Sequence, residues 1–138
     1  MATVGATETL PVRGGDDVGR VRHRVRDLAT SLGFDLVAQT RLVTAASELA
    51  RNTHTYGGGG MLTISELDDG RRRGLRLEFV DEGRGIADLR QALTDGWSSG
   101  GGLGLGLSGT RRLVDEFVIE SEPGRGTRVE ITQWLRRR

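Results

Sequence analysis

The sequence lacks cysteine and lysine, and each absence excludes a class of functional site. With no cysteine in 138 residues, the chain has no disulfides, no thiolate zinc site and no cysteine nucleophile. All 20 residues counted as lysine or arginine are arginine, which excludes a Walker A lysine, a Schiff-base lysine and the strand lysine of eukaryotic-type protein kinases. No apolar run approaches the ~18 residues of a membrane span, and no secretory signal pattern opens the chain. We therefore expect a cytoplasmic protein with no membrane partner.

Net charge is also nearly absent, because 20 arginines oppose 19 acidic residues and leave a formal charge of +1. We therefore expect no general attraction to nucleic acid. The arginines at 71–73 and 136–138 are interpreted as a solvated turn and a tail, with basic binding patches as the alternative. The length fits one globular domain over 1–138, with disordered tails at about 1–6 and 136–138.

Glycine, in contrast, is abundant, with 22 residues, many of them in clusters at 57–60 and 100–106. Clusters of glycine between periodic segments indicate positive-φ turns, or a backbone that approaches a ligand closely.

Hydrophobic periodicity predicts helices and strands in the order β-α-α-β-β-α-β-β. Apolar residues recur at helical spacing in a first helix that starts at Asp16 or Asp17 and ends at Gly33, and in a second helix that Asp35 caps and that runs to about Thr55. The remaining elements are expected to be helices over 86–93 and 105–115 and strands over 7–12, 61–67, 75–80, 117–121 and 127–134. Consecutive strands with tight turns imply an α+β two-layer sandwich of the α/β class, with a mixed, mostly antiparallel sheet and helices on one face.

The first candidate site segment is Glu48-Leu49-Ala50-Arg51-Asn52, on the second helix. Glu48 and Asn52 are four residues apart, so their side chains share one helix face. An amide oxygen is a suitable ligand for Mg²⁺, and a carboxylate one turn away can accept a proton. A solvated polar stripe is the alternative interpretation of these residues.

The second segment, Asp81-Glu82-Gly83-Arg84-Gly85, follows an apolar strand. An aspartate at the end of a strand is a rigidly held acceptor, suited to an exocyclic amine such as that of adenine. The glycines at 83 and 85 remove side chains that would block a flat ligand. A strand-to-loop turn with a capping aspartate is the alternative.

The third segment is the glycine-rich run Gly100-Gly101-Gly102-Leu103-Gly104-Leu105-Gly106, which leads into a helix. Backbone N–H groups that glycines expose at a helix N-terminus form an anion site. The usual dinucleotide-binding context is missing, because no parallel strand with a βαβ crossover fits here.

In this order and spacing the three segments, followed by Gly126-Thr127 at the start of a strand, resemble the GHKL (Bergerat-fold) ATP-binding superfamily over about residues 35–134. That superfamily includes histidine kinases, gyrase-type ATPases, Hsp90 and anti-sigma-factor serine kinases. Glutamate at position 48, where histidine kinases generally carry asparagine, is typical of its serine/threonine kinases. The blocks most similar to the RsbT-type switch kinases of bacterial stress signalling are 44–52, 95–107, 115–117 and 132–135.

The resemblance implies a protein serine/threonine kinase that uses ATP and Mg²⁺. By that analogy, Asp81 binds the adenine amino group, and Thr127 supports Asp81 or its water. Asn52 coordinates the Mg²⁺ that bridges the phosphates, and Glu48 is the general base. The remaining nucleotide-binding positions are the glycines of both loops and the leucines between them: Gly83, Gly85, Gly102, Leu103, Gly104, Leu105 and Gly106.

The resemblance also implies protein partners. The phosphorylated substrate would be a STAS-domain antagonist, and the released kinase would activate a PP2C-type phosphatase. Two alternatives stay open: an anti-sigma-factor kinase that sequesters a sigma factor, and a non-catalytic module that binds ATP and docks a phosphatase. A homodimer is left open as well. The helix over 17–32, with Arg20 and Arg24 outward, is either a docking surface or a solvated face.

Overall fold

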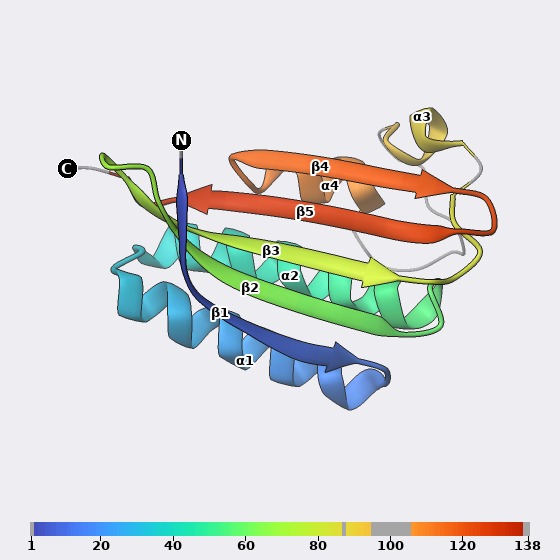
Figure 1. The fold of residues 1–138 in the computed structure, drawn as a ribbon, viewed down its shortest axis with the longest axis horizontal. Coiled ribbons are helices and arrows are strands. Elements are labelled where there is room, and N and C mark those ends of the chain that lie inside the picture. The colour runs from blue at the N-terminus through green and yellow to red at the C-terminus, as the bar shows by residue number, and fades with distance from the viewer. Residues whose placement is uncertain (1, 87, 95–105, 137–138) are drawn as a thin grey trace.

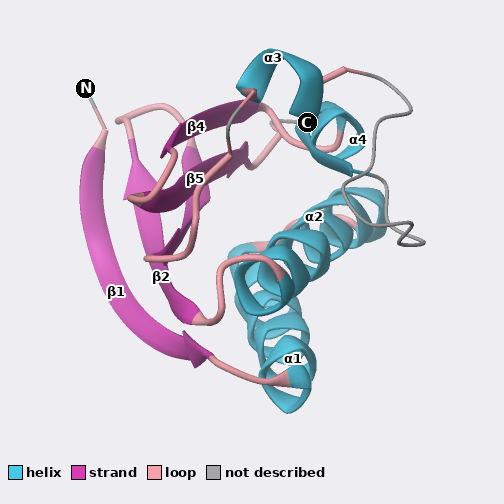
Figure 2. Ribbon diagram, turned by 90° about the vertical axis from the view of Figure 1, so that its right-hand side faces the viewer, coloured by secondary structure: helices cyan, strands magenta, loops and turns pink. Residues whose placement is uncertain are grey.

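The computed structural model describes residues 2–86, 88–94 and 106–136. Within them lies one five-stranded sheet, ordered β1-β2-β3-β5-β4, in which every strand pair is antiparallel. Helices α1, α2 and α4 lie on one side of this sheet and leave its other face open, which confirms the expected two-layer arrangement (Figures 1 and 2). The elements are β1 (Thr3–Val12), α1 (Gly15–Leu32), α2 (Leu36–Thr55), β2 (Gly60–Asp68), β3 (Arg73–Asp81), α3 (Leu89–Ala92), α4 (Gly106–Arg112), β4 (Glu116–Glu122) and β5 (Gly126–Trp134).

The sheet and the helices meet in a hydrophobic core, because alternate strand residues point toward the helices. On β3, Leu77 and Phe79 are buried, and Ile64 and Ile131 flank Leu77 on the neighbouring strands. α2 contacts α1, α4 and the sheet, as its broad apolar set predicts. The buried apolar residues of α1 recur at helical spacing: Val18, Val21, Val25, Ala29 and Leu32.

The turn between α1 and α2 has the predicted caps. Gly33 ends α1 with a φ of +96°, a left-handed conformation that favours glycine. Asp35 caps α2 by accepting a hydrogen bond from the Ala38 amide at 2.8 Å. These caps set the start of α2, which then runs behind the sheet toward the end of β3 (Figure 1).

Two predictions at the N-terminus are wrong. Residues 3–6 belong to β1, so the strand is longer than expected and the loose tail over 1–6 is corrected for these residues. The N-cap of α1 is Gly14, not Asp16 or Asp17. Asp17 instead accepts a hydrogen bond from the Arg13 amide at 2.9 Å, which fastens the end of β1 to the helix.

The two α1 arginines expected to point outward are engaged within the molecule. Arg24 donates to both oxygens of Glu8 on β1, at 2.7 to 3.0 Å. Arg20 donates to Asp17 at 2.6 Å. These pairs tie α1 to the edge strand and to its own first turn, while both side chains stay partly exposed, at 67% for Arg20 and 43% for Arg24.

Later element boundaries differ modestly from the prediction. The helix expected over 86–93 is the single turn α3, and the one expected over 105–115 is the shorter α4. α4 ends at Arg112 because residues 113–115 turn the chain into β4. The Arg41 side chain donates to the Arg112 carbonyl at 3.0 Å, so the end of α4 is fixed to α2.

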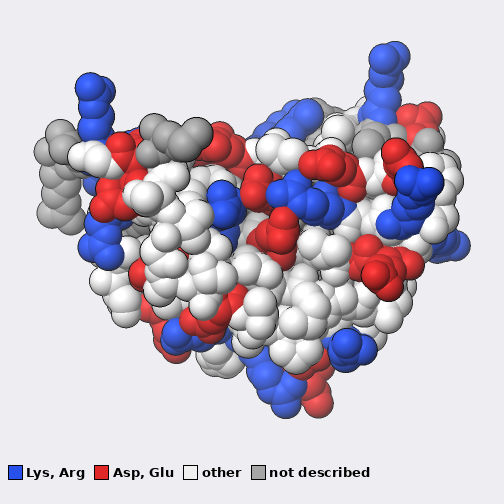
Figure 3. All heavy atoms as spheres, in the orientation of Figure 1, with Lys and Arg blue, Asp and Glu red and all other residues white. Residues whose placement is uncertain are grey.

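The open face of the sheet, seen in Figure 3, carries charges of both signs. Arg128 on β5 pairs with Glu78 at 2.6 Å, with Glu120 at 3.1 Å and with Glu130 at 3.2 Å. Opposite charges on β3, β4 and β5 therefore compensate one another across this face. No helix in the described part of the chain is long and apolar enough to cross a membrane.

Candidate nucleotide-binding site

The C-terminal half of α2 carries the first site segment, with Glu48 and Asn52 one helical turn apart on the same face. The Glu48 side chain is 15% exposed and accepts a hydrogen bond from Arg51 at 2.8 Å. An ionised carboxylate has about four acceptor positions, so this pairing leaves Glu48 able to accept a hydrogen bond from another group. A mostly buried carboxylate does not fit the alternative of a solvated stripe.

Asp81, the last residue of β3, lies beside the C-terminal end of α2. The contact runs through Gly57, where a Cβ would lie 2.3 Å from Asp81 Cγ. The Gly57 amide donates to the Asn52 carbonyl at 3.2 Å, so Gly57 is in turn fixed to the helix. A side chain at position 57 would displace the carboxylate. The fold thus brings the helix segment and the aspartate segment together at one end of the sheet (Figure 1).

The Asp81 carboxylate is both desolvated and held by backbone amides. Burial raises the pKa of Asp81, and the amides of Gly83 and Thr127 oppose that rise. The Gly83 amide donates to Asp81 Oδ1 at 2.9 Å. A half-buried carboxylate in a site of low dielectric interacts strongly with a donor that reaches it, so Asp81 is suited to bind an amine.

The glycines at 83 and 85 lie where no side chain fits. A Cβ on Gly83 would lie 2.8 Å from the Gly57 carbonyl oxygen. A Cβ on Gly85, which has a φ of +74°, would lie 2.1 Å from the Glu122 carbonyl oxygen. Close backbone approach therefore requires both glycines, and it packs the loop after β3 against the Gly57 segment that follows α2 on one side and against the β4–β5 hairpin on the other.

Thr127 faces Asp81 in the register of β3 and β5. Its hydroxyl lies 2.8 Å from Ser121 Oγ, whereas its backbone amide is the group that acts on the Asp81 carboxylate. The predicted support of Asp81 by Thr127 therefore comes from the main chain. Gly57 belongs to the glycine cluster at 57–60 that the sequence pointed to, whereas Ser121 was not singled out. The register of β4 and β5 pairs Ser121 with Thr127, and this pairing is what brings Ser121 to the site.

Most of the predicted phosphate-binding loop lies outside the described residues, namely Gly102, Leu103, Gly104 and Leu105. Gly106 begins α4 and has a φ of +72°, which favours glycine. The glycine that joins the loop to the helix is thus placed as predicted. The binding of phosphate by these residues remains a prediction.

Among the described residues, no group of three or more His, Asp or Glu side chains is arranged to hold a metal ion. A Mg²⁺ ion that bridges nucleotide phosphates needs only one or two protein ligands. Asn52 fits that requirement, because its side chain is half-buried, shares a face with Glu48 and has no hydrogen-bond partner in the described part of the chain.

Comparison with known proteins agrees with this arrangement. Residues 37–137 match the family described as histidine kinase-, DNA gyrase B- and HSP90-like ATPase. The serine/threonine-protein kinase RsbT of Bacillus subtilis is 44% identical over 120 residues, which cover 87% of this chain and 90% of RsbT. The anti-sigma F factor of Clostridium acetobutylicum is 32% identical over 114 residues, or 78% of each chain. That of a Thermoanaerobacter species is 31% identical over 98 residues, or 67% of each chain.

Solved structures show the same fold. The RsbU and RsbW domains of a Mycobacterium tuberculosis protein match with a TM-score of 0.62 and 21% identity over 91% of this chain and 32% of that longer one. The mycobacterial sensor histidine kinase MprB matches with a TM-score of 0.56 and 18% identity over 96% of this chain and 100% of its own. Because the family match spans most of the chain and RsbT aligns with nearly all of it, the chain belongs to the histidine kinase-, DNA gyrase B- and HSP90-like ATPase family and, within it, to the serine/threonine-protein kinases.

Proposed function

We propose that this chain transfers the γ-phosphoryl group of ATP to a serine or threonine of a STAS-domain protein in a bacterial stress-signalling module. The observation that carries the proposal is the meeting of two segments at one end of the sheet. Asp81 lies in a cradle of glycines there and is packed against Gly57, which follows the α2 segment that bears Glu48 and Asn52. Phosphoryl transfer needs positioning and charge neutralisation above all, and these groups can supply both.

In this proposal the base of the nucleotide binds at the end of β3. Asp81 accepts a hydrogen bond from the adenine amino group, and Gly83 and Gly85 let the loop after β3 pack closely enough to hold Asp81 in place. The phosphates bind the amides of the glycine-rich loop, whose residues are Gly102, Leu103, Gly104, Leu105 and Gly106. Backbone amides at the start of a helix replace the missing lysine as phosphate-binding groups.

Asn52 would hold the Mg²⁺ ion, which when bound neutralises charge on the phosphates. Its amide oxygen is suited to this hard cation, and its position one turn after Glu48 places metal ligand and base on one face. Asn52→Ala should therefore weaken binding of Mg-ATP far more than binding of metal-free ATP. Equal weakening of both would argue against a metal ligand.

Glu48 is the general base in the proposed transfer. The acceptor hydroxyl forms a new O–P bond to the γ-phosphorus, the bond from that phosphorus to the β–γ bridging oxygen breaks, and ADP leaves. The proton of the hydroxyl passes to the Glu48 carboxylate. Arg51, which pairs with Glu48 at 2.8 Å, helps to hold this carboxylate on the helix face.

The deciding experiment measures phosphotransfer from γ-labelled Mg-ATP to a STAS-domain protein from the same genomic neighbourhood. Glu48→Ala should still bind Mg-ATP but lose transfer by at least ~10²-fold, because general-base catalysis contributes about that much. Asp27→Ala, which removes an exposed carboxylate from α1, is the matched control and should keep full activity. Undiminished transfer by Glu48→Ala would show that Glu48 is structural.

A second candidate function is docking rather than catalysis. The two relatives named anti-sigma F factor, at 31% and 32% identity, favour a variant in which this chain sequesters a sigma factor. The RsbT-type resemblance instead favours activation of a PP2C-type phosphatase after the STAS partner is released. Co-purification with a sigma factor or with a phosphatase distinguishes these two partners.

A further inference from the structure

The hydroxyl of Ser121, on β4, contacts three groups beside the proposed nucleotide site. It accepts a hydrogen bond from the Ile86 amide at 2.7 Å and donates to the Gly126 carbonyl at 2.9 Å. It also lies 2.8 Å from the Thr127 hydroxyl. Ser121 therefore joins the β4–β5 hairpin to the loop that follows Asp81, together with a bond from the Gly124 amide to the Arg84 carbonyl at 2.7 Å.

Counting protons fixes the direction of the bond between Ser121 and Thr127. A serine hydroxyl has one proton, and a carbonyl oxygen can only accept. The single proton of Ser121 is therefore used on the Gly126 carbonyl. Thr127 must then donate its own proton to Ser121, and Thr127 Oγ1 offers only lone pairs to any other partner.

The acceptor character of Thr127 matters because of where the residue lies. Thr127 is the register partner of Asp81 across β3 and β5, and an ionised Asp81 also only accepts. A ligand at this end of the sheet thus meets two acceptors side by side. An exocyclic amine has two N–H donors and matches them, whereas a ring carbonyl in the same place would face lone pairs.

We propose that Ser121 is a specificity-determining residue, which makes Thr127 a hydrogen-bond acceptor and thereby favours a 6-amino purine over a 6-oxo purine. The inference rests on the proposed function, because it requires the base to bind beside Asp81. Ser121 acts through Thr127 and is a positioning residue.

The test compares the affinities of ATP and inosine triphosphate, which differ in the group at C6 of the base. In Ser121→Ala the Thr127 hydroxyl loses its acceptor, so it can turn and donate to a 6-oxo group. The preference for ATP should fall by about 2- to 10-fold, the range of one net hydrogen bond. Ser121→Thr keeps the hydroxyl and should restore the preference. Ser65→Ala, on β2, removes another strand hydroxyl and should leave both affinities unchanged.

The ratio of the two affinities separates this role from simple support of the loop. A merely structural Ser121 would weaken both nucleotides equally in Ser121→Ala, and that result would overturn the inference. If Ser121→Ala does not fold, Thr127→Val decides, because loss of the acceptor must also reduce the ATP preference. If the ratio of ATP affinity to inosine triphosphate affinity is unchanged in Thr127→Val, the inference is overturned and the proposed function still stands. Failure of the unaltered protein to bind ATP would overturn the proposed function, and the inference with it.

Discussion

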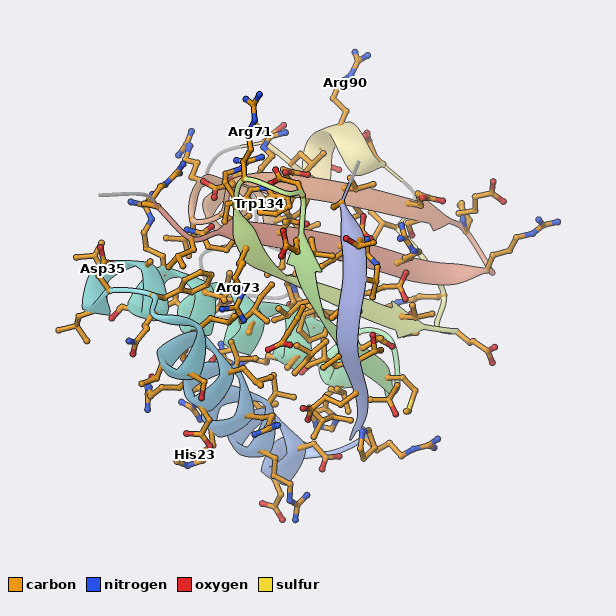
Figure 4. All side chains as sticks on the ribbon, turned by 60° about the vertical axis from the view of Figure 1, so that its left-hand side comes forward. His23, Asp35, Arg71, Arg73, Arg90 and Trp134 are labelled. Atoms are coloured by element: carbon orange, nitrogen blue, oxygen red, sulfur yellow. The ribbon has the colours of Figure 1, made fainter. Side chains whose placement is uncertain are left out.

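The two ends of β3 are built in opposite ways. At the site end, where the strand stops at Asp81, the chain approaches itself through glycines, and Gly57 and Gly83 lie against each other without side chains. At the other end, which we call the tryptophan end, side chains fill the equivalent space. There Trp134 lies over Gly74, whose Cβ would be 2.8 Å from Trp134 Cε3. Figure 4 shows Trp134 beside the β2–β3 turn, from which Arg71 points outward.

Hydrogen bonds and an aromatic contact hold Trp134 in place at the tryptophan end. The Trp134 ring donates to Glu116 at 2.5 Å, and the Arg72 guanidinium stacks on it with 4.3 Å between its Cζ and the ring centroid. Asp115 accepts from the Trp134 amide at 2.8 Å and also pairs with Arg136. Because Arg136 forms this ion pair, the first arginine of the predicted tail at 136–138 is held against the folded domain. The two ends therefore differ in what fills them: side chains fill the tryptophan end, whereas at the site end backbone segments pack against one another through glycines.

The largest expected effect is a loss of stability at the tryptophan end. Trp134→Ala removes a ring that is only 6% exposed, and the free energy of unfolding should fall by about 3–5 kcal/mol. By strand rise, Gly74 under the Trp134 ring and Asp81 are roughly 23 Å apart, so ATP affinity of the folded fraction should not change. Denaturant unfolding and calorimetry measure the two quantities. A parallel loss of ATP affinity in folded protein would contradict the separation of the ends.

At the site end, Asp81→Asn should weaken ATP binding about 100-fold, because a charged acceptor for the amine is lost. The substitution keeps the shape of the side chain and should leave thermal stability almost unchanged. Asp115→Asn provides the matched control, since it removes a carboxylate from the tryptophan end and should spare ATP binding. Isothermal titration with ATP compares them, and normal affinity in Asp81→Asn would disprove the adenine assignment.

A smaller effect is expected when a single methyl group is added to the site end. Gly57→Ala places a Cβ against Asp81 and should weaken ATP binding about tenfold by displacing the carboxylate. Gly19→Ala is the control, because nothing lies within 4 Å of a Cβ there. It should stabilise α1 by up to about 1 kcal/mol and leave ATP affinity unchanged. Equal affinities of the two variants would show that the cradle around Asp81 is not needed.

The smallest expected effect is the change of ATP affinity with pH, which should develop gradually over the pH range. Because burial raises the pKa of Asp81, its carboxyl takes up a proton at higher pH than an ordinary aspartate. ATP affinity should therefore fall as pH falls through this raised pKa. The contribution of the same group to folding has the opposite sign, since a raised folded-state pKa favours the folded protein at low pH. Binding titrations over a pH series test this, and Asp81→Asn should lack the transition.

Much of the fold and of the site could be predicted from the sequence where a local pattern was sufficient. Helical spacing and the caps at Gly33 and Asp35 predicted α1 and α2, because these signals act within a few residues. The spacing of Glu48 and Asn52 set their common face for the same reason. The N-cap of α1 was mispredicted because Asp17 had a stronger partner, the Arg13 amide at the end of β1. The Arg13 amide reaches Asp17 because the chain turns directly from the end of β1 into α1.

The sequence alone determined the elements, their alternation and the segments with site chemistry, since all of these depend on neighbours along the chain. Only the tertiary structure decided that Gly57 lies against Asp81, that the Ile86 amide donates to the Ser121 hydroxyl, and that Trp134 covers Gly74. These contacts join residues far apart in the sequence, and their geometry follows from strand register and helix packing. The contrast between an end filled by side chains and an end built on glycine contacts is therefore a property of the folded sheet.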